Sequence, residues 1–258
     1  MQLIGQAIRH ETFGKGVVTG CGKNILTICF SQGEKKFIYP DAFAKHLTLK
    51  NSDMQSRIQT ILNEREAERE AEQQAVQESR ERRYLLDNLK ISPNAQAVFD
   101  IKAEEEHMCF SAWSVSTGRY LSGYSKGEPR IPDRLKPNSL CLLTERGDGA
   151  PEEERRVIGA FMVGEDFFGS TCRDGIIKSH PVYRLKLRSA DRPRFWPYIT
   201  GDATVQRWGA ASFKYLSNKT MKKILFDIKE CLAGGEDAEL AEGIYQYFCR
   251  INRLCSEA

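Results

Sequence analysis

The sequence predicts a mixed α+β protein in which a small β-barrel is joined, through a long charged helical linker, to a larger β-barrel flanked by helices. Three observations predict this organisation. Short apolar stretches alternate with glycine-containing turns in residues 1–50, residues 54–89 contain no proline or glycine, and residues 95–258 combine apolar strands with two amphipathic helices. The 258 residues, 41% hydrophobic and 28% charged, suit a folded chain. We expect a barrel in 1–50, a linker in 51–94 and a main domain in 95–258.

The first 50 residues have the pattern of a five-stranded, SH3-like barrel. Strands are expected around His10–Val18, at Ile25–Phe30 and at Lys35–Tyr39, and the segment from Asp41-Ala-Phe43 through Leu47-Thr-Leu49 would close the barrel. Glycines between them supply the positive φ angles that tight turns require. The segment misses the dinucleotide-binding motif, because Thr19 stands where that motif has its third glycine.

A glycine-rich pattern surrounds the first predicted strand. It reads His10-x-x-Phe13-Gly14-x-Gly16-x-Val18 and is followed by Phe30 at a strand end and by Lys36-Phe37. Over about 45 residues this pattern resembles the Tudor-like tail module of bacterial superfamily 1 DNA-repair helicases. The resemblance implies a module that docks on a protein or a nucleic acid, with RNA polymerase as one partner in that family. His10 is either a contact residue or, as we favour, a side chain that caps a turn.

Residues 51–94 are predicted to form a solvated helix that spaces two modules apart. Asn51-Ser52-Asp53 supplies N-capping side chains, and Glu64–Glu72 combines charged residues with alanine, all strong helix formers. At ~1.5 Å per residue the helix would span roughly 50 Å before Pro93 ends it. The strongly apolar residues lie near its ends and the middle has no heptads, so a stable coiled coil is not expected, although a weak dimer contact stays open through Ala67, Ala71 and Ala75.

Residues 95–258 are predicted to contain four strands followed by two helices. Met108–Val115 alternates in polarity, whereas Ser139–Thr144 and Arg156–Val163 are largely apolar, which is typical of buried strands. In the fourth strand, Val182–Leu187, the expected outer face holds Val182, Arg184 and Lys186. Two apolar stripes indicate the helices: Met221, Ile224, Leu225, Ile228 and Leu232, stopped by Gly234-Gly235, then Leu240, Ile244, Tyr247, Phe248, Ile251 and Leu254.

Three short segments of this region carry a second resemblance. They are Phe110-Ser-Ala-Trp113-Ser, Leu135-Lys-Pro137-Asn-Ser-Leu-Cys-Leu-Leu143 and Val157-Ile-Gly159-Ala-Phe-Met-Val163. In their order, and within a match of about 120 residues, they resemble the PUA-like group, which includes EVE, YTH and ASCH domains. The resemblance implies a PUA-like β-barrel flanked by helices. It also implies recognition of a nucleic-acid base, often a modified one, in an aromatic pocket.

Positive charge and aromatic rings concentrate in the same part of the chain. Residues 173–229 contain 13 basic and 4 acidic residues, and Arg192–Tyr198 interleaves cations with rings. Rings stack on bases and cations hold phosphates, so this pattern favours nucleic-acid binding. Core packing is the alternative role for the rings. The expected base-binding residues are Trp113, Trp196, Trp208, Phe195, Tyr198 and Ser111, and the expected phosphate-binding residues are Lys178, Arg184, Lys186, Arg188, Arg192, Arg194, Arg207 and Lys214.

No other chemistry is indicated. None of the eight cysteines forms a C-x-x-C pair, and no nucleophile elbow or metal-spaced carboxylate pair is visible. No cofactor, metal or membrane span is expected, and Met1–Gly5 lacks the basic start of a secretory signal, which favours a cytoplasmic protein with reduced cysteines. The sequence therefore predicts a non-enzymatic protein that binds RNA or DNA. The alternative is a protein-interaction adaptor that docks on its partner through residues 1–50.

Overall fold

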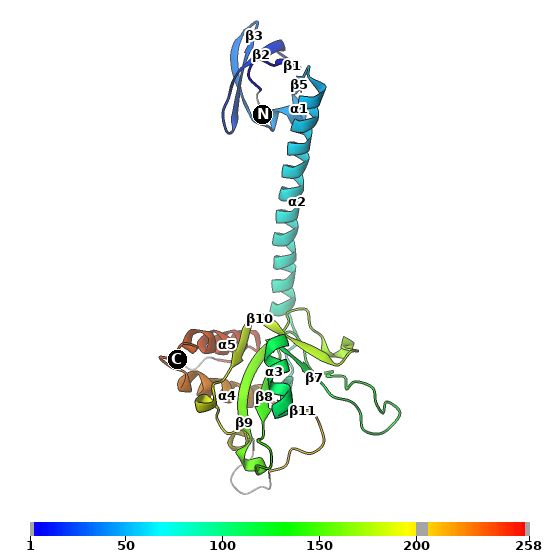
Figure 1. The fold of residues 1–258 in the computed structure, drawn as a ribbon, viewed down its shortest axis with the longest axis vertical. Coiled ribbons are helices and arrows are strands. Elements are labelled where there is room, and N and C mark those ends of the chain that lie inside the picture. Colours follow the sequence, from blue (N-terminus) through cyan, green and yellow to red (C-terminus); the bar gives the residue numbers. More distant parts are fainter. Residues whose placement is uncertain (1–2, 200–205, 256–258) are drawn as a thin grey trace. The chain divides into compact units, whose positions relative to one another are not determined.

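A computed structural model describes residues 3–199 and 206–255 of the chain (Figure 1). The chain divides into two compact units, Met1–Glu81 (unit 1) and Arg82–Ala258 (unit 2). The fold is mixed α+β, with two sheets, one of them curled into a half-barrel, and one long helix. The predicted class is thus confirmed. The assignment of the sheets to SH3-like and PUA-like barrels, and the domain limits at residues 50 and 94, stay predictions.

Unit 1 contains a five-stranded antiparallel sheet in the order β4-β3-β2-β1-β5. Alternate strand residues face one core, in which Ile8, Val18 and Leu26 are at most 3% exposed. The strand predicted at Ile25–Phe30 is confirmed. The elements are β1 (Ala7–His10), β2 (Gly14–Cys21), β3 (Ile25–Phe30), β4 (Gly33–Ile38), α1 (Ala42–Lys45) and β5 (Leu47–Leu49).

His10 caps the turn between β1 and β2. Its Nδ1 accepts the backbone N–H groups of Thr12 (2.9 Å) and Phe13 (3.3 Å), and its ring packs 4.6 Å from that of Phe13, centroid to centroid. The side chain is only 7% exposed. The capping role that the sequence favoured for His10 is therefore confirmed.

The long helix α2 (Ser52–Asp87) forms where the charged stretch predicted it. Asn51 Oδ1 accepts the backbone N–H of Met54 (3.1 Å), so Asn51 caps the helix as expected. Its buried residues, Ile58 and Leu62, pack into the core of unit 1. The middle of the helix is exposed, because its charged side chains leave no apolar face to bury.

Unit 2 is built on a six-stranded sheet in the order β11-β6-β8-β9-β10-β7, in which β6 and β8 are parallel and the other neighbours antiparallel. Its strands are β6 (Gln96–Asp100), β7 (Ser114–Ser116), β8 (Leu140–Glu145), β9 (Arg156–Val163), β10 (Ile176–Lys186) and β11 (Phe213–Leu216). Its helices are α3 (Ala103–Ala112), α4 (Asn218–Cys231) and α5 (Ala238–Ile251), with 3-10 turns η1 (Glu152–Glu154), η2 (Gly169–Thr171), η3 (Ser189–Asp191) and η4 (Trp196–Tyr198).

Helices cover both faces of this sheet. Val98 and Leu142 pack with α4 and α5 on one face, whereas their neighbours Phe99 and Leu143 pack with α3 on the other. Strands buried on both faces read as apolar runs, which is why β8 and β9 were predicted correctly. The two apolar stripes are also confirmed as helices, since α4 and α5 bury Ile224, Ile228, Ile244 and Phe248.

The strand predicted at Met108–Val115 is wrong. Residues 103–112 form α3, and only Ser114–Ser116 is extended. Ala103 and three glutamates begin the segment with strong helix formers, and the carboxylate of Glu105 accepts the Lys102 backbone N–H (3.4 Å). Cys109 and Phe110 are adjacent in the sequence, but a helix buries both on one side. Alternating polarity over eight residues therefore led to the wrong prediction of a strand where the chain forms a helix.

A network of amides joins the first strand of unit 2 to its last helix. Gln96 Nε2 donates to Asn218 Oδ1 (3.0 Å) and to Asn252 Oδ1 (3.3 Å), and Asn138 Nδ2 also donates to Asn252 Oδ1 (2.8 Å). All four side chains are at most 5% exposed. Their mutual hydrogen bonds replace most of those that water would make, although Asn138 Oδ1 is buried with no partner among the described residues. The network therefore fixes how the C-terminal helix meets the sheet.

The cysteines of the chain are free thiols, four buried and four exposed. Burial raises the pKa of Cys109 to about 11, so this thiol stays protonated and unreactive at neutral pH. Within residues 3–199 and 206–255, no helix has both the length and the apolar composition that crossing a bilayer requires.

Candidate nucleic-acid interface

The predicted ring residues fall into two groups on opposite faces of the unit 2 sheet. Trp196 and Trp208 are 4% and 5% exposed and lie with Phe195 in the core on the α4 and α5 side. Tyr198 packs against the same core and is half-buried. Trp113 packs against the core on the α3 side and is also half-buried. In the described part of the chain, the three tryptophans therefore do not surround one cavity.

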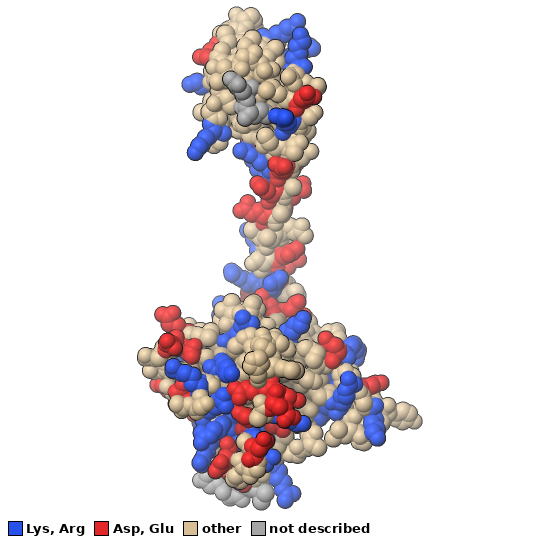
Figure 2. All heavy atoms as spheres, viewed as in Figure 1, with Lys and Arg blue, Asp and Glu red and all other residues tan. Residues whose placement is uncertain are grey.

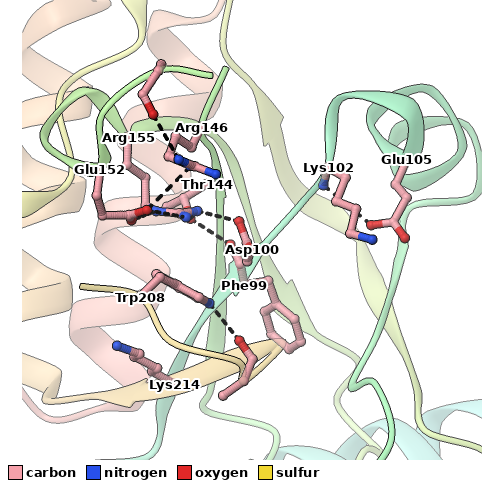
Figure 3. A network of polar contacts seen from close by, with 12 residues as sticks. Phe99, Asp100, Lys102, Glu105, Thr144, Arg146, Glu152, Arg155, Trp208 and Lys214 are labelled. Atoms are coloured by element: carbon pink, nitrogen blue, oxygen red, sulfur yellow. Dashed lines mark hydrogen bonds and ion pairs between the residues drawn. The ribbon is translucent and has the colours of Figure 1, made fainter. Parts of the chain in front are cut away.

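Trp208 forms part of the wall of a pocket of about 520 Å³ beside the beginning of α3 (Figure 3). Arg155 lies over the Trp208 ring, with its guanidinium carbon 4.3 Å from the centroid of the indole. The guanidinium is paired with Asp100 (2.5 Å) and with Glu152. The indole Nε1–H donates to the carbonyl of Ala211 (2.6 Å), which fixes the ring. We call this site the Trp208 pocket.

The charges that line the Trp208 pocket compensate one another. Burial acts to lower the pKa of Arg155, but hydrogen bonds to Glu152 and Asp100 outweigh it and raise that pKa above its usual value. The lining contains four carboxylates and four cations, so a phosphate would meet no excess of positive charge. Gln206 Oε1 is buried in this lining with no hydrogen-bond partner among the described residues. It offers an acceptor to the N–H of an uncharged ligand.

Trp113 lies at the other end of α3, where it is the C-cap residue with a φ of 46°. A left-handed backbone is uncommon for a bulky residue, so contacts around it must hold this conformation. The Ser179 N–H donates to the Trp113 carbonyl (2.9 Å), and the Phe110 ring meets the indole edge-on at 5.3 Å between centroids. The guanidinium carbon of Arg184 lies 5.0 Å from the indole centroid.

Further predicted cations lie beside Trp113. Lys178 is opposite Ser114 in the register of β10 with β7, and Lys186 Nζ lies 4.6 Å from the centroid of the Phe110 ring. Lys186 is paired with Glu106 (3.2 Å), whereas Arg184 forms no ion pair with any residue that the structure describes. Lys178 has no such pair within 4 Å, but the pKa of Asp174 is lowered by the Ile176 backbone N–H and also by the charge of Lys178. Together with the exposed Ser111 at the end of α3, these side chains form a surface that we call the Trp113 face: Ser111, Trp113, Lys178, Arg184 and Lys186.

The other five predicted phosphate-binding residues lie outside the Trp113 face. Arg192 is held by Glu106 (2.8 Å) and Glu145 (3.1 Å), and Arg188 is held by Asp191 (3.0 Å), so carboxylates already compensate both charges. The remaining three are Arg194, which is exposed, Arg207, which lines the Trp208 pocket, and Lys214, whose Nζ lies 5.1 Å from the centroid of the Trp208 ring.

Helix α3 connects the two sites. Residues 102–104, at its beginning, line the Trp208 pocket, and Trp113 follows its last residue. Ten helical residues span roughly 15 Å, so the pocket and the face lie about that far apart along one rigid element.

Sequence reasoning missed the polar side chains of the Trp208 pocket. Arg155 follows three glutamates in a charged stretch that reads as a solvated loop, yet it is 2% exposed. Its partner Asp100 is 55 positions away, and Gln206 was not selected although it directly precedes the predicted pair Arg207-Trp208. The only available signal was that Arg155 stands directly before a strongly apolar strand, where the chain must enter the core.

Comparisons with known proteins gave no match. No protein-family model matches the chain, and neither a curated protein nor a solved structure matches it.

Proposed function

We propose that the chain is a non-enzymatic nucleic-acid-binding protein that holds a strand of RNA or DNA on the Trp113 face. The supporting observation is that a half-buried indole meets Arg184, a cation that forms no ion pair with a carboxylate in the described part of unit 2, and that Lys178 and Lys186 lie on the same strand, β10. An indole stacks on a base for about 1–3 kcal/mol, and unpaired cations neutralise phosphates. This surface combines both requirements.

The Trp208 pocket supports the finer proposal that one base, in native or modified form, leaves the strand and is read there. The pocket volume of about 520 Å³ suits a nucleobase, and its balanced charges favour an uncharged heterocycle over a phosphate. Gln206 Oε1 would accept a hydrogen bond from an amino or imino group of that base. The proposal agrees with a PUA-like assignment of unit 2 and a Tudor-like assignment of unit 1.

The test is binding of the full chain to fluorescent oligonucleotides of about 12 nucleotides, single-stranded and duplex, RNA and DNA, at about 50 mM salt. Trp113→Asn removes the ring but keeps a residue that tolerates the left-handed backbone. It should weaken binding by about 5- to 150-fold. Arg188→Ala is the matched control, because its guanidinium is already paired with Asp191, and it should change Kd less than about twofold. No detectable binding to any of the four ligands, or equal Kd for Trp113→Asn and the wild type, would refute the proposal.

A second candidate function is that of an adaptor, and a groove of unit 1 favours it. The groove, of about 950 Å³, is lined by four lysine or arginine side chains and by Glu11 as its one carboxylate in the described lining. Glu11 lies 3.5 Å from His46, whereas the four cations form no ion pair with described residues. Such a groove suits an acidic segment of a protein. The cations are Arg9, Lys15, Lys45 and Lys50.

The adaptor function is tested with purified bacterial RNA polymerase, the partner that the Tudor-like resemblance suggests. Arg9→Glu with Lys15→Glu should abolish its binding to the full chain, because both charges of this strand pair reverse. Lys35→Glu with Lys36→Glu, on β4, is the control. Binding that needs nucleic acid, or that the groove variant leaves intact, would exclude this function.

A further inference from the structure

The loop of residues 118–130, which follows β7, is ordered by its own hydrogen bonds. The Tyr120 N–H donates to the Glu128 carbonyl (3.0 Å), the Gly127 N–H donates to the Tyr120 carbonyl (2.9 Å), and the Arg130 N–H donates to the Gly118 carbonyl (2.9 Å). The loop therefore has the paired base of a hairpin. In Figure 1 it leaves the end of β7 and projects away from the sheet.

The base of the loop is fixed to unit 2. The guanidinium carbon of Arg130 lies 5.4 Å from the centroid of the buried Phe213 ring. The Thr117 N–H donates to the Gly175 carbonyl (2.8 Å). Gly118 has a φ of 70°, and a Cβ at this position would lie 1.9 Å from Ser212 Oγ, so the chain turns here against a packed neighbour. The base of the projecting loop is therefore fixed to unit 2 by these contacts.

The tip of the loop exposes apolar side chains. Tyr124 is fully exposed, and Leu121 is 68% exposed. Most of the surface of both side chains is open to solvent, although a loop that only connects two elements does not need apolar side chains at its tip. Exposed apolar groups on an ordered projection are a feature of elements that insert into a partner.

Positive charge surrounds this tip. Arg119 and Lys126 are exposed on the two arms of the loop, and Arg130 lies at its base. The same segment contains one carboxylate, that of Glu128. Figure 2 shows Lys and Arg side chains, in blue, on this projection. The loop also continues the Trp113 face, because the three residues of β7 are all that separate Trp113 from Thr117. At ~3.3 Å per residue, the loop begins roughly 10–15 Å from the indole.

We propose that the tip of this loop is a wedge, which inserts Tyr124 and Leu121 into a duplex where a base pair is mismatched or already weakened. The inference rests on the proposed nucleic-acid binding of the Trp113 face and extends it to a duplex ligand. A planar ring and a branched apolar side chain separate neighbouring bases, while cations on both arms hold the flanking phosphates. Unstacking costs least where pairing is already lost, so the wedge selects such positions.

A protein pocket or a lipid surface fits these observations less well. A docking tip for an apolar protein pocket does not need cations on both arms, and a lipid surface does not need a neighbouring ring-and-cation face. Continuity with the Trp113 face, where Arg184 lies against the indole and has no ion pair with a described carboxylate, favours nucleic acid.

The experiment uses the full chain and DNA or RNA duplexes of about 20 base pairs, with 2-aminopurine beside a central mismatch. The wild type should raise the 2-aminopurine fluorescence and bind the mismatched duplex at least about fivefold more tightly than the matched one. Leu121→Ser with Tyr124→Ser should abolish both effects while leaving single-strand Kd and thermal stability unchanged. Tyr84→Ser is the matched control, because Tyr84 is an exposed tyrosine of α2 outside the loop, and it should behave as the wild type.

The outcomes separate the two proposals. If the wild type binds no oligonucleotide at all, the nucleic-acid function itself fails. If it binds but the fluorescence does not rise, or if the Leu121→Ser, Tyr124→Ser variant keeps the mismatch preference, the wedge is refuted and the function stands. If that variant instead loses only binding to RNA polymerase or to phosphatidylglycerol vesicles, the tip is a protein or lipid contact, which also overturns the wedge.

Discussion

Two arginine–tryptophan pairs in unit 2 have nearly the same geometry and opposite surroundings. Arg155 lies 4.3 Å from the Trp208 ring and is 2% exposed between Asp100 and Glu152. Arg184 lies 5.0 Å from the Trp113 ring, is partly exposed, and has no carboxylate partner in the described structure. The pair itself therefore does not define a binding surface. The presence or absence of nearby carboxylates decides whether such a pair is a structural element or an available site.

Removing the guanidinium of each pair should produce the largest contrast. Arg155→Ala leaves Asp100 without its cation, and leaves Glu152 with only Arg146 (3.5 Å), in a partly buried site, and we expect it to lower the free energy of unfolding by about 3 kcal/mol. Arg184→Ala should lower it by less than about 1 kcal/mol and weaken nucleic-acid binding instead. Urea denaturation measures both. Equal losses of stability would mean that both pairs are structural elements and would contradict the role given to the nearby carboxylates.

Gly159 lies under the Phe110 ring, so a substitution there should disturb the Trp113 region through Phe110. A Cβ on Gly159 would lie 2.6 Å from the Leu185 carbonyl oxygen and 2.8 Å from the Phe110 ring, which supports the indole of Trp113. Gly159→Ala should therefore cost about 1–3 kcal/mol of stability and weaken oligonucleotide binding.

The control for this substitution is Gly243→Ala in α5, where no atom lies within 4 Å of the added Cβ. Alanine is the better helix former, so this variant should keep or gain up to about 1 kcal/mol of stability and leave binding unchanged. A Gly159→Ala protein with wild-type stability and binding would show that Phe110 yields without moving Trp113.

The two regions also differ in their expected response to pH. The strand that carries Arg184 also carries His180, whereas the described lining of the Trp208 pocket contains no histidine. Burial lowers the pKa of His180. The carboxylate of Glu165, 3.7 Å away, acts to raise that pKa, but burial has the larger effect. His180 Nδ1 accepts the backbone N–H groups of Val182 (3.1 Å) and Tyr183 (3.2 Å), so the folded chain needs the neutral ring.

Because the folded pKa of His180 is below the unfolded value of about 6.5, its contribution to stability is complete above that pH and is lost as the pH falls below it. Free energies of unfolding measured between about pH 7.5 and 5.5 should decline, and His180→Gln should flatten the decline. A wild-type profile that is level over this window, or one that rises on acidification, would contradict the assignment.

The smallest expected effect concerns salt. Lys178→Ala should reduce the slope of log Kd against log salt by about 1, because one phosphate contact is lost. Arg146→Ala, in the Trp208 pocket, should leave the slope unchanged, since Arg146 is paired with Glu152 (3.5 Å). Equal slopes for Lys178→Ala and the wild type would remove Lys178 from the Trp113 face as a functional residue.

Local periodicity predicted the elements whose burial it reflects. Ile25–Phe30, Arg156–Val163 and the two C-terminal helices carry their pattern within a few residues. The short strand Gln96–Asp100 was not predicted, since its position depends on β8 and β11, which lie far away in the sequence. Met108–Val115 was assigned wrongly, because alternation over eight residues does not distinguish a strand from a helix with one buried side.

The candidate site was predictable in its residue types but not in its pairings. The sequence places Arg207 beside Trp208, yet the guanidinium that lies over that ring belongs to Arg155. Likewise Trp113 meets Arg184, 71 positions further along the chain. Which cation meets which ring, and which carboxylate neutralises it, follows from strand register and helix packing. A single sequence does not display either.

The buried amides of Gln96, Asn138, Asn218 and Asn252 have a consequence for synthesis on the ribosome. The first partner to emerge is Gln96. Its Oε1 accepts the Leu140 N–H, but its Nε2 finds its acceptors only when Asn218 and Asn252, more than 100 positions later, have followed it. Unit 2 therefore completes its packing after nearly the whole chain has been translated. Nascent chains that stop before Asn252 cannot bury these amides with their hydrogen bonds made, so the apolar surface around them stays exposed and is open to chaperones and proteases.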